Sequence, residues 1–196
     1  MNQTMEKTKR IFIAAEFPDI VIQQLAAVVK QQWPDFTQGI RWVPTTQYHL
    51  TLKFIGDYPV SGIPAIQEVL HSTYNQINAI PLTLSGFGVF PNPRQPRVLW
   101  AGIKAADTLI DSQKQLEKGL AAMGIPPENR AFSPHLTLAR VKDDFPSNRL
   151  PALLHPMNAE NNPFHQPTTV IRITLFESQL SRQGAIYRSI ESLKIG

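Results

Sequence analysis

The tetrapeptide His-Leu-Thr-Leu occurs twice in the chain, at residues 49–52 and again at residues 135–138. In each copy an imidazole stands two residues before a hydroxyl. Successive side chains of a β-strand point to opposite faces of the sheet, so each copy predicts a strand with histidine and threonine on one face and leucines on the other. Two such strands facing one another would line a cleft with two histidines and two threonines.

These side-chain types suit acid–base chemistry on a phosphate ester. An imidazole with an unperturbed pKa of about 6.5 exchanges a proton near neutral pH, so His49 and His135 could act as acid and base without a metal. The hydroxyls of Thr51 and Thr137 could donate hydrogen bonds to the phosphate oxygens. The chain has no cysteine, which excludes thiol catalysis, and two histidines without a suitably spaced third ligand disfavour a zinc site.

Five residues after each motif histidine the copies differ, with Phe54 in the first and Arg140 in the second. On a regular strand an odd offset would point both side chains away from the cleft, whereas a β-bulge would turn both into it. There they could hold a nucleobase between a ring and a guanidinium plane, and Arg140 could also bind the phosphate. Packing in the core is an equal alternative for Phe54.

The composition is that of an ordinary folded protein. The chain has 196 residues, 42% of them hydrophobic, and a net charge of +4. The basic residues are scattered, which favours a small anionic substrate or the end of a nucleic acid over a long duplex. Residues 1–10 are polar and no apolar run approaches a membrane span, so we expect a cytoplasmic protein that is not bound to a membrane. A monomer is the default, because no interface pattern is visible.

The apolar patterns predict the elements that position the motifs. Strands are expected at 10–17, 48–55, 82–90, 97–103, 135–141, 168–180 and 185–194, and helices at 18–33, 63–77, 107–123 and 150–154. Gly56 and Asp57 are expected to end the first motif strand, and residues 181–184 to form a hairpin turn. Strand and helix alternate similarly around each motif, which predicts an α+β fold of two pseudo-symmetric lobes, with antiparallel sheets and outer helices around a central cleft.

The remaining histidines and two tryptophans have simpler interpretations. His71, His155 and His165 lie in an expected helix or in a Pro- and Asn-rich stretch, where contact with solvent is the default. Trp42 and Trp100 have apolar strand neighbours, which favours packing in the core over stacking on a base.

The two motifs and their flanks resemble those of the 2H phosphoesterase superfamily. The nearest likeness is to its LigT/ThpR branch, the RNA 2',3'-cyclic phosphodiesterases. It extends over RIFIAAEFP, HLTLKFIG, RVLWAGI, SPHLTLAR and LFESQLSRQGAIY, but not over residues 143–167. The resemblance implies one domain over residues 1–196, made of two intertwined lobes with one motif each. It also implies hydrolysis of an RNA 2',3'-cyclic phosphate end or a cyclic nucleotide to a 2'-phosphate, without metal or cofactor. Some members also join RNA ends through 2'–5' linkages.

The resemblance carries roles over to the matching positions. His49 and His135 would be catalytic, Thr51 and Thr137 would bind phosphate, and Arg140 fits the basic residue that ends the second motif. A 2'-phosphate product makes O3' the leaving oxygen, and we expect His49 to protonate it while His135 activates water. The reverse assignment stays open, because the two copies are identical over four residues.

Two other functions fit the same residues. A non-catalytic module could use the threonines and the arginine to bind a phosphate-ended RNA or a nucleotide, although binding alone does not need two histidines. An enzyme with the same cleft could instead act on another cyclic or 2'–5'-linked nucleotide. A test for turnover distinguishes the binding module from an enzyme. Product analysis over a panel of RNA ends distinguishes an enzyme for RNA ends from one that acts on another nucleotide.

Overall fold

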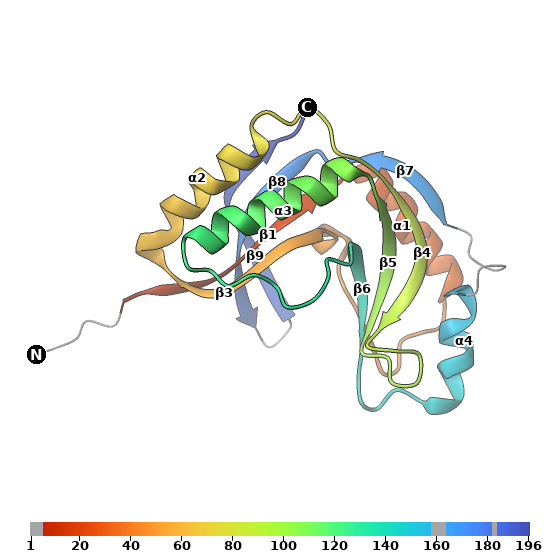
Figure 1. Cartoon of the computed structure of the whole chain (residues 1–196). Coiled ribbons are helices and arrows are strands. Elements are labelled where there is room, and N and C mark those ends of the chain that lie inside the picture. The colour runs from red at the N-terminus through yellow and green to blue at the C-terminus, as the bar shows by residue number, and fades with distance from the viewer. Residues whose placement is uncertain (1–5, 158–163, 182–183) are drawn as a thin grey trace, which may run out of the picture.

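The structure is a computed structural model that describes residues 6–157, 164–181 and 184–196. Its described part holds one antiparallel sheet in the order β7-β4-β5-β6-β3-β1-β8-β9, with β2 paired to β6 (Figure 1). The strands are β1 (Thr8–Glu16), β2 (Ile40–Trp42), β3 (Leu50–Pro59), β4 (Pro81–Phe90), β5 (Val98–Ala105), β6 (His135–Val141), β7 (His165–Thr169), β8 (Arg172–Ser181) and β9 (Gly184–Lys194). The helices are α1 (Asp19–Gln32), α2 (Ile63–Tyr74), α3 (Asp107–Ala122) and α4 (Leu150–Leu154).

The two motif strands, β3 and β6, are neighbours at the centre of the sheet. They meet at one antiparallel bridge between Leu50 and Leu136 and then diverge (Figure 1). The bridge joins a half made of β3, β1, β8 and β9 to a half made of β6, β5, β4 and β7. The predicted α+β class is confirmed, with the difference that the sheets of the two halves are hydrogen-bonded into one.

The same irregularity interrupts both motif strands. Against β1, Thr51 pairs with Ala14 and Lys53 with Ile13, so Leu52 is an extra residue. Against β5, Leu138 is the extra residue, since Thr137 and Ala139 pair with consecutive residues. An extra residue is a β-bulge, which bends the strand and shifts its alternation by one position. In each strand the extra leucine and the residue after it are therefore both buried. The side chain five residues after the histidine then lies on the face opposite to the one it would occupy on a regular strand.

The helices cover the face of the sheet that carries the motif leucines. In α1, Val21, Leu25 and Val29 recur every four residues and are buried, as expected for a helix with one apolar face. Helices α2 and α3 lie side by side, with α2 against β9 and α3 reaching β4 and β5 (Figure 1). Helices α1 and α4 lie beside the half that contains β4 and β5 (Figure 1). Within the described residues, no helix has the length and apolar character that crossing a bilayer requires.

Two strand predictions were wrong at their boundaries. Strand β3 continues through Gly56 to Pro59, because a positive φ of 84° at Gly56 accommodates a second irregularity against β1. The expected strand at 168–180 is split. At Val170 the backbone N–H donates to Ile80, and at Ile171 it donates to Glu16, so the chain crosses there from one half of the sheet to the other.

The predicted hairpin between the last two strands is partly outside the described residues. Ser181 and Gly184 pair as the last residues of β8 and β9, and residues 182–183 between them are not described. The remaining helices and strands lie within a few residues of their predicted positions, and β4 and β5 form the expected antiparallel pair.

Candidate active site

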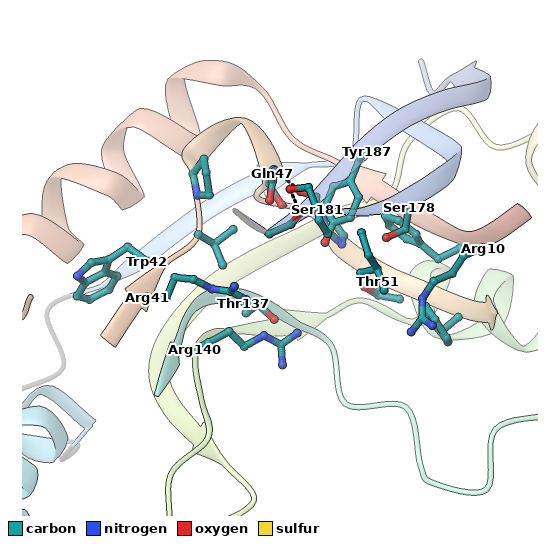
Figure 2. A pocket seen from close by; sticks show the side chains of 18 residues that line it. Arg10, Arg41, Trp42, Gln47, Thr51, Thr137, Arg140, Ser178, Ser181 and Tyr187 are labelled. Carbon is teal, nitrogen blue, oxygen red and sulfur yellow. Dashed lines mark hydrogen bonds between the residues drawn. The ribbon is translucent and has the colours of Figure 1, made fainter. Parts of the chain in front are cut away.

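A cleft of about 530 Å³ lies where β3 and β6 diverge, and residues of β1, β2, β8 and β9 close its other sides. It is lined by five of the six predicted site residues, namely His49, Thr51, Phe54, Thr137 and Arg140. Figure 2 shows Thr51 on one strand and Thr137 and Arg140 on the other around this space. The sixth, His135, does not line the cleft itself; it begins β6, two residues before Thr137.

The bridge between β3 and β6 gives the motifs a near-twofold arrangement. When the antiparallel register at Leu50 and Leu136 is continued by one residue, His49 lies opposite Thr137 and His135 lies opposite Thr51. The leucines of the bridge are buried on the other face. Neither threonine hydroxyl is hydrogen-bonded to another described residue, so both can donate to a ligand.

Both imidazoles are held by the same local contact. Nδ1 of His49 donates to the carbonyl oxygen of Gln47 at 2.7 Å, and Nδ1 of His135 donates to that of Ser133, also at 2.7 Å. A carbonyl only accepts hydrogen bonds, so in both rings Nδ1 carries the proton. Nε2 is therefore the nitrogen that takes up or releases a proton in each motif.

Aromatic rings from the neighbouring strands surround His49. Its ring centre lies 5.1 Å from that of Phe12 on β1, 5.4 Å from Tyr187 on β9 and 6.4 Å from Phe176 on β8. Burial lowers the pKa of His49 from 6.5 to about 4, with a further lowering by the charge of His135 and an opposing contribution from the Gln47 carbonyl. The contribution of His135 is consistent with the register, which puts the two motif histidines on neighbouring strands.

Fewer aromatic rings surround His135. Phe90 on β4 meets it edge-on at 5.0 Å between ring centres, and Trp100 on β5 lies at 6.3 Å. Burial is the main cause that lowers the pKa of His135, and the charge of Arg140 lowers it further. The core prediction for Trp100 is wrong, because its indole packs beside His135 and over Gly88, where a Cβ would approach the ring to 2.1 Å.

The half-buried His49 makes the fold sensitive to acid. In the unfolded chain this imidazole binds a proton near pH 6.5, but in the folded protein only near pH 4. Between these values the unfolded state binds more protons, so the free energy of unfolding falls as the pH drops from 6.5 to 4, by up to about 3 kcal/mol. Urea unfolding at a series of pH values measures this loss. It should be smaller in His49→Gln; an equal loss in that variant would assign the acid sensitivity to other groups.

The cleft is rich in positive charge. Three arginines line it, Arg10 from β1, Arg41 from β2 and Arg140 from β6, and none of its described lining residues is acidic. The sequence analysis did not identify Arg10 or Arg41 as site residues. Arg41 follows the buried Ile40, so alternation along β2 was a usable signal for it. No alternation marks Arg10, because residues 11–15 after it are all buried.

Phe54 faces the cleft, as the bulge hypothesis predicted, and the alternative of core packing is wrong. Its side chain is 43% exposed, and the guanidinium carbon of Arg10 lies 4.8 Å from its ring centre. Tyr187 was also missed, because the hairpin of β8 and β9 reaches the cleft only through the long-range pairing of β8 with β1. Trp42 lines the cleft as well, although it also packs partly against the core as predicted.

The other histidines lie away from this cleft. Nε2 of His71 is 3.6 Å from a carboxylate oxygen of Glu191, and His155 and His165 are exposed. In the described part of the chain, no three histidine, cysteine, aspartate or glutamate side chains converge in a way that could hold a metal ion.

Comparison with known proteins places this geometry in a family. The model of the 2'-5' RNA ligase superfamily matches residues 31–182. A protein of Methanothermobacter thermautotrophicus named RNA 2',3'-cyclic phosphodiesterase is 32% identical, over 80% of this chain and 83% of its own length. A protein of the same name from Aquifex aeolicus is 30% identical, over 97% of this chain and 99% of its own length.

A solved structure shares the fold. The crystal structure of TT0787 of Thermus thermophilus superposes with a TM-score of 0.77 at 28% identity, covering 95% of this chain and 97% of the other. The family resemblance expected from the paired motifs is thereby confirmed. The chain belongs to the 2'-5' RNA ligase superfamily.

Proposed function

We propose that this protein hydrolyses the 2',3'-cyclic phosphate at the end of an RNA and leaves a 2'-phosphate. The observation that carries the proposal is the pair of histidines, each with Nδ1 bound to a backbone carbonyl, related by a near-twofold axis beside an acid-free cleft. In the proposed reaction one histidine acts as proton donor and the other as proton acceptor on a phosphate bound between the two motifs. The relatives named RNA 2',3'-cyclic phosphodiesterase support the same activity.

The reaction needs two proton transfers. One imidazole, with Nε2 unprotonated, removes a proton from water as the water oxygen bonds to phosphorus. The other imidazole, protonated at Nε2, donates its proton to O3' as the P–O3' bond breaks. We assign the acid to His49 and the base to His135. Burial lowers the pKa of His49 in the unliganded protein, and the negative charge of a bound phosphate raises it again, which favours the protonated ring that the acid requires. Thr51, Thr137 and Arg140 stabilise the negative charge on the non-bridging oxygens by hydrogen bonds that strengthen in the transition state.

Ligation is the related reaction that the family description names. If an RNA 5'-hydroxyl replaces water as the nucleophile, the same proton transfers lead to a 2'–5' linkage. A non-catalytic binding module remains the alternative to an enzyme, and it predicts tight binding of a phosphate-ended RNA without any product.

Hydrolysis in the presence of EDTA tests the proposal. An oligoribonucleotide that ends in a 2',3'-cyclic phosphate should be converted to a 2'-phosphate, identified by phosphorus NMR, at a rate that the chelator does not change. Loss of activity in EDTA would contradict a metal-independent mechanism. A 3'-phosphate product would overturn the assignment of O3' as the leaving oxygen.

We also propose that the terminal nucleobase stacks on Phe54, with Arg140 on its other side. Replacement of Phe54 with alanine should raise KM for the RNA end about 10-fold, since stacking of a base on an aromatic ring contributes roughly 1–3 kcal/mol. Steady-state kinetics measures this change. Ile186→Ala removes another exposed apolar side chain that does not line the cleft and is the matched control. An unchanged KM in Phe54→Ala would contradict stacking.

Three features remain predictions from the sequence. The cytoplasmic location, the monomeric state and the organisation of residues 1–196 as one domain of two intertwined lobes are part of this proposal. Size-exclusion chromatography with light scattering measures the second of these directly.

A further inference from the structure

Two arginines of the cleft are direct cross-strand neighbours. In the antiparallel pairing of β2 with β6, Arg41 lies opposite Arg140. Like charges in this position repel one another and destabilise a sheet. The pair therefore costs stability in the unliganded protein, and an anion between the two guanidinium groups would remove that cost.

No carboxylate of the described residues compensates this pair. Among the described residues neither Arg41 nor Arg140 has a salt-bridge partner, whereas Lys9 pairs with Glu177 and Arg97 with Asp143. Arg41 is exposed, and its Nη1 lies 4.0 Å from the position that a Cβ on Gly184 would occupy, beside the β8–β9 hairpin. Both guanidinium groups point into the cleft (Figure 2).

The cleft carries more positive charge than is needed to neutralise one cyclic phosphate. A cyclic phosphodiester carries a single negative charge, which Arg140 and the two threonines already match. Arg41 adds a permanent positive charge at the end of the cleft formed by β2, where Trp42, Val43 and Pro44 follow it. Unpaired arginines along a cleft are typical of sites that follow a nucleic-acid backbone.

We propose that Arg41 binds a second phosphate group, the internucleotide phosphodiester that precedes the terminal nucleotide. The inference rests on the proposed function and narrows its substrate class to an RNA chain, as opposed to a cyclic mononucleotide. In this arrangement Arg140 contacts the cyclic phosphate beside Thr137, and Arg41 on the adjacent strand contacts the next phosphate. A substrate with two phosphates then screens the repulsion between the arginines.

Three substrates that differ in length and in the charge of the internucleotide linkage test the proposal. They are a 2',3'-cyclic mononucleotide, a dinucleotide with the same cyclic end, and that dinucleotide with a neutral methylphosphonate linkage. The native protein should act on the charged dinucleotide with a kcat/KM about 10- to 100-fold above that for the neutral one, the effect expected of a hydrogen-bonded ion pair. In Arg41→Gln this ratio should fall to about one.

Arg94→Gln is the matched control. It removes the same charge from an exposed arginine outside the cleft, so it should keep the native ratio. A ratio near one in the native protein, or an unchanged ratio in Arg41→Gln, would overturn the proposal. A fall of the ratio to about one in Arg10→Gln, with the native ratio kept in Arg41→Gln, would also overturn the proposal. That result would place the second phosphate at the opposite end of the cleft.

Binding of product separates this inference from the proposed function. The affinity of a dinucleotide that ends in a 2'-phosphate, measured by calorimetry with the charged and the neutral linkage, needs no turnover. If the native protein hydrolyses none of the three substrates, the proposed function fails, while a preference for the charged linkage that Arg41→Gln removes still supports the second phosphate site. Equal affinities for the two linkages would contradict it.

Discussion

Replacement of either His49 or His135 with alanine should lower kcat for an RNA with a 2',3'-cyclic phosphate end by about 10²- to 10⁴-fold. Each ring supplies one of two proton transfers, and its Nδ1 contact with a backbone carbonyl holds it in place. Because the two transfers belong to one reaction, the double variant should lose far less than the product of the two single effects. Single-turnover hydrolysis, with circular dichroism to verify folding, measures these values.

The control for this prediction is His165→Ala. His165 is exposed on β7 and does not line the cleft, so its replacement should leave kcat within a factor of two. Full activity in either His49→Ala or His135→Ala would rule out paired acid–base catalysis.

A substrate with sulfur in place of O3' distinguishes the acid from the base. A thiolate leaves with little help from a proton, so the variant that lacks the acid should recover most of its activity on this substrate. We expect recovery in His49→Ala and not in His135→Ala. Recovery in His135→Ala alone would reverse the two assignments and leave the two-histidine mechanism intact.

Removal of Glu117 should destabilise the fold by about 3–5 kcal/mol, because it leaves a buried ammonium group without its counter-charge. Nζ of Lys53 lies 2.8 Å from a carboxylate oxygen of Glu117 and 2.7 Å from the carbonyl oxygen of Pro126, and the lysine side chain is only 2% exposed. Lys53 is buried since the bulge at Leu52 turns it toward α3. Urea unfolding of Glu117→Ala measures the loss.

A second ion pair of α3 is the matched control. Lys114 and Asp111 lie 3.5 Å apart on the solvent side, and each side chain is mostly exposed. Asp111→Ala should therefore change stability by less than about 1 kcal/mol. The double variant Lys53→Met with Glu117→Leu should regain most of the stability lost in Glu117→Ala, since apolar residues can replace a buried pair. A loss in Glu117→Ala no larger than in Asp111→Ala would contradict a structural role for the buried pair.

Local patterns predicted the part of the site that lies within each motif. Alternation placed the histidines and threonines on one face, and the hypothesis of a β-bulge placed Phe54 and Arg140 in the cleft, which both residues line. The equivalence of the copies is a property of the sequence itself. It therefore needed no knowledge of how distant strands pair.

Residues brought to the cleft by long-range pairing were missed. Tyr187 reaches it because the hairpin of β8 and β9 pairs with β1, and Arg41 because β2 pairs with β6. Trp100 was placed in the core since its neighbours are apolar, but the alternation of β5 puts it on the face of His135. Pairing partners in an antiparallel sheet depend on the whole topology, which no short window of sequence encodes. The catalytic and phosphate-binding roles of the site residues stay predictions.

At Val170 and Ile171 the chain passes from one half of the sheet to the other, so neither half is formed by one continuous stretch of the sequence. Strand β4, which precedes the second motif, belongs to the half that contains β6, and β8 near the C-terminus belongs to the half that contains β3. A fragment that ends between β4 and β5 lacks β8 as the partner of β1, and its complement lacks β4 as the partner of β5. Contacts of such high sequence separation slow folding. We therefore expect that a fragment carrying only one of the two motifs does not fold as an independent module.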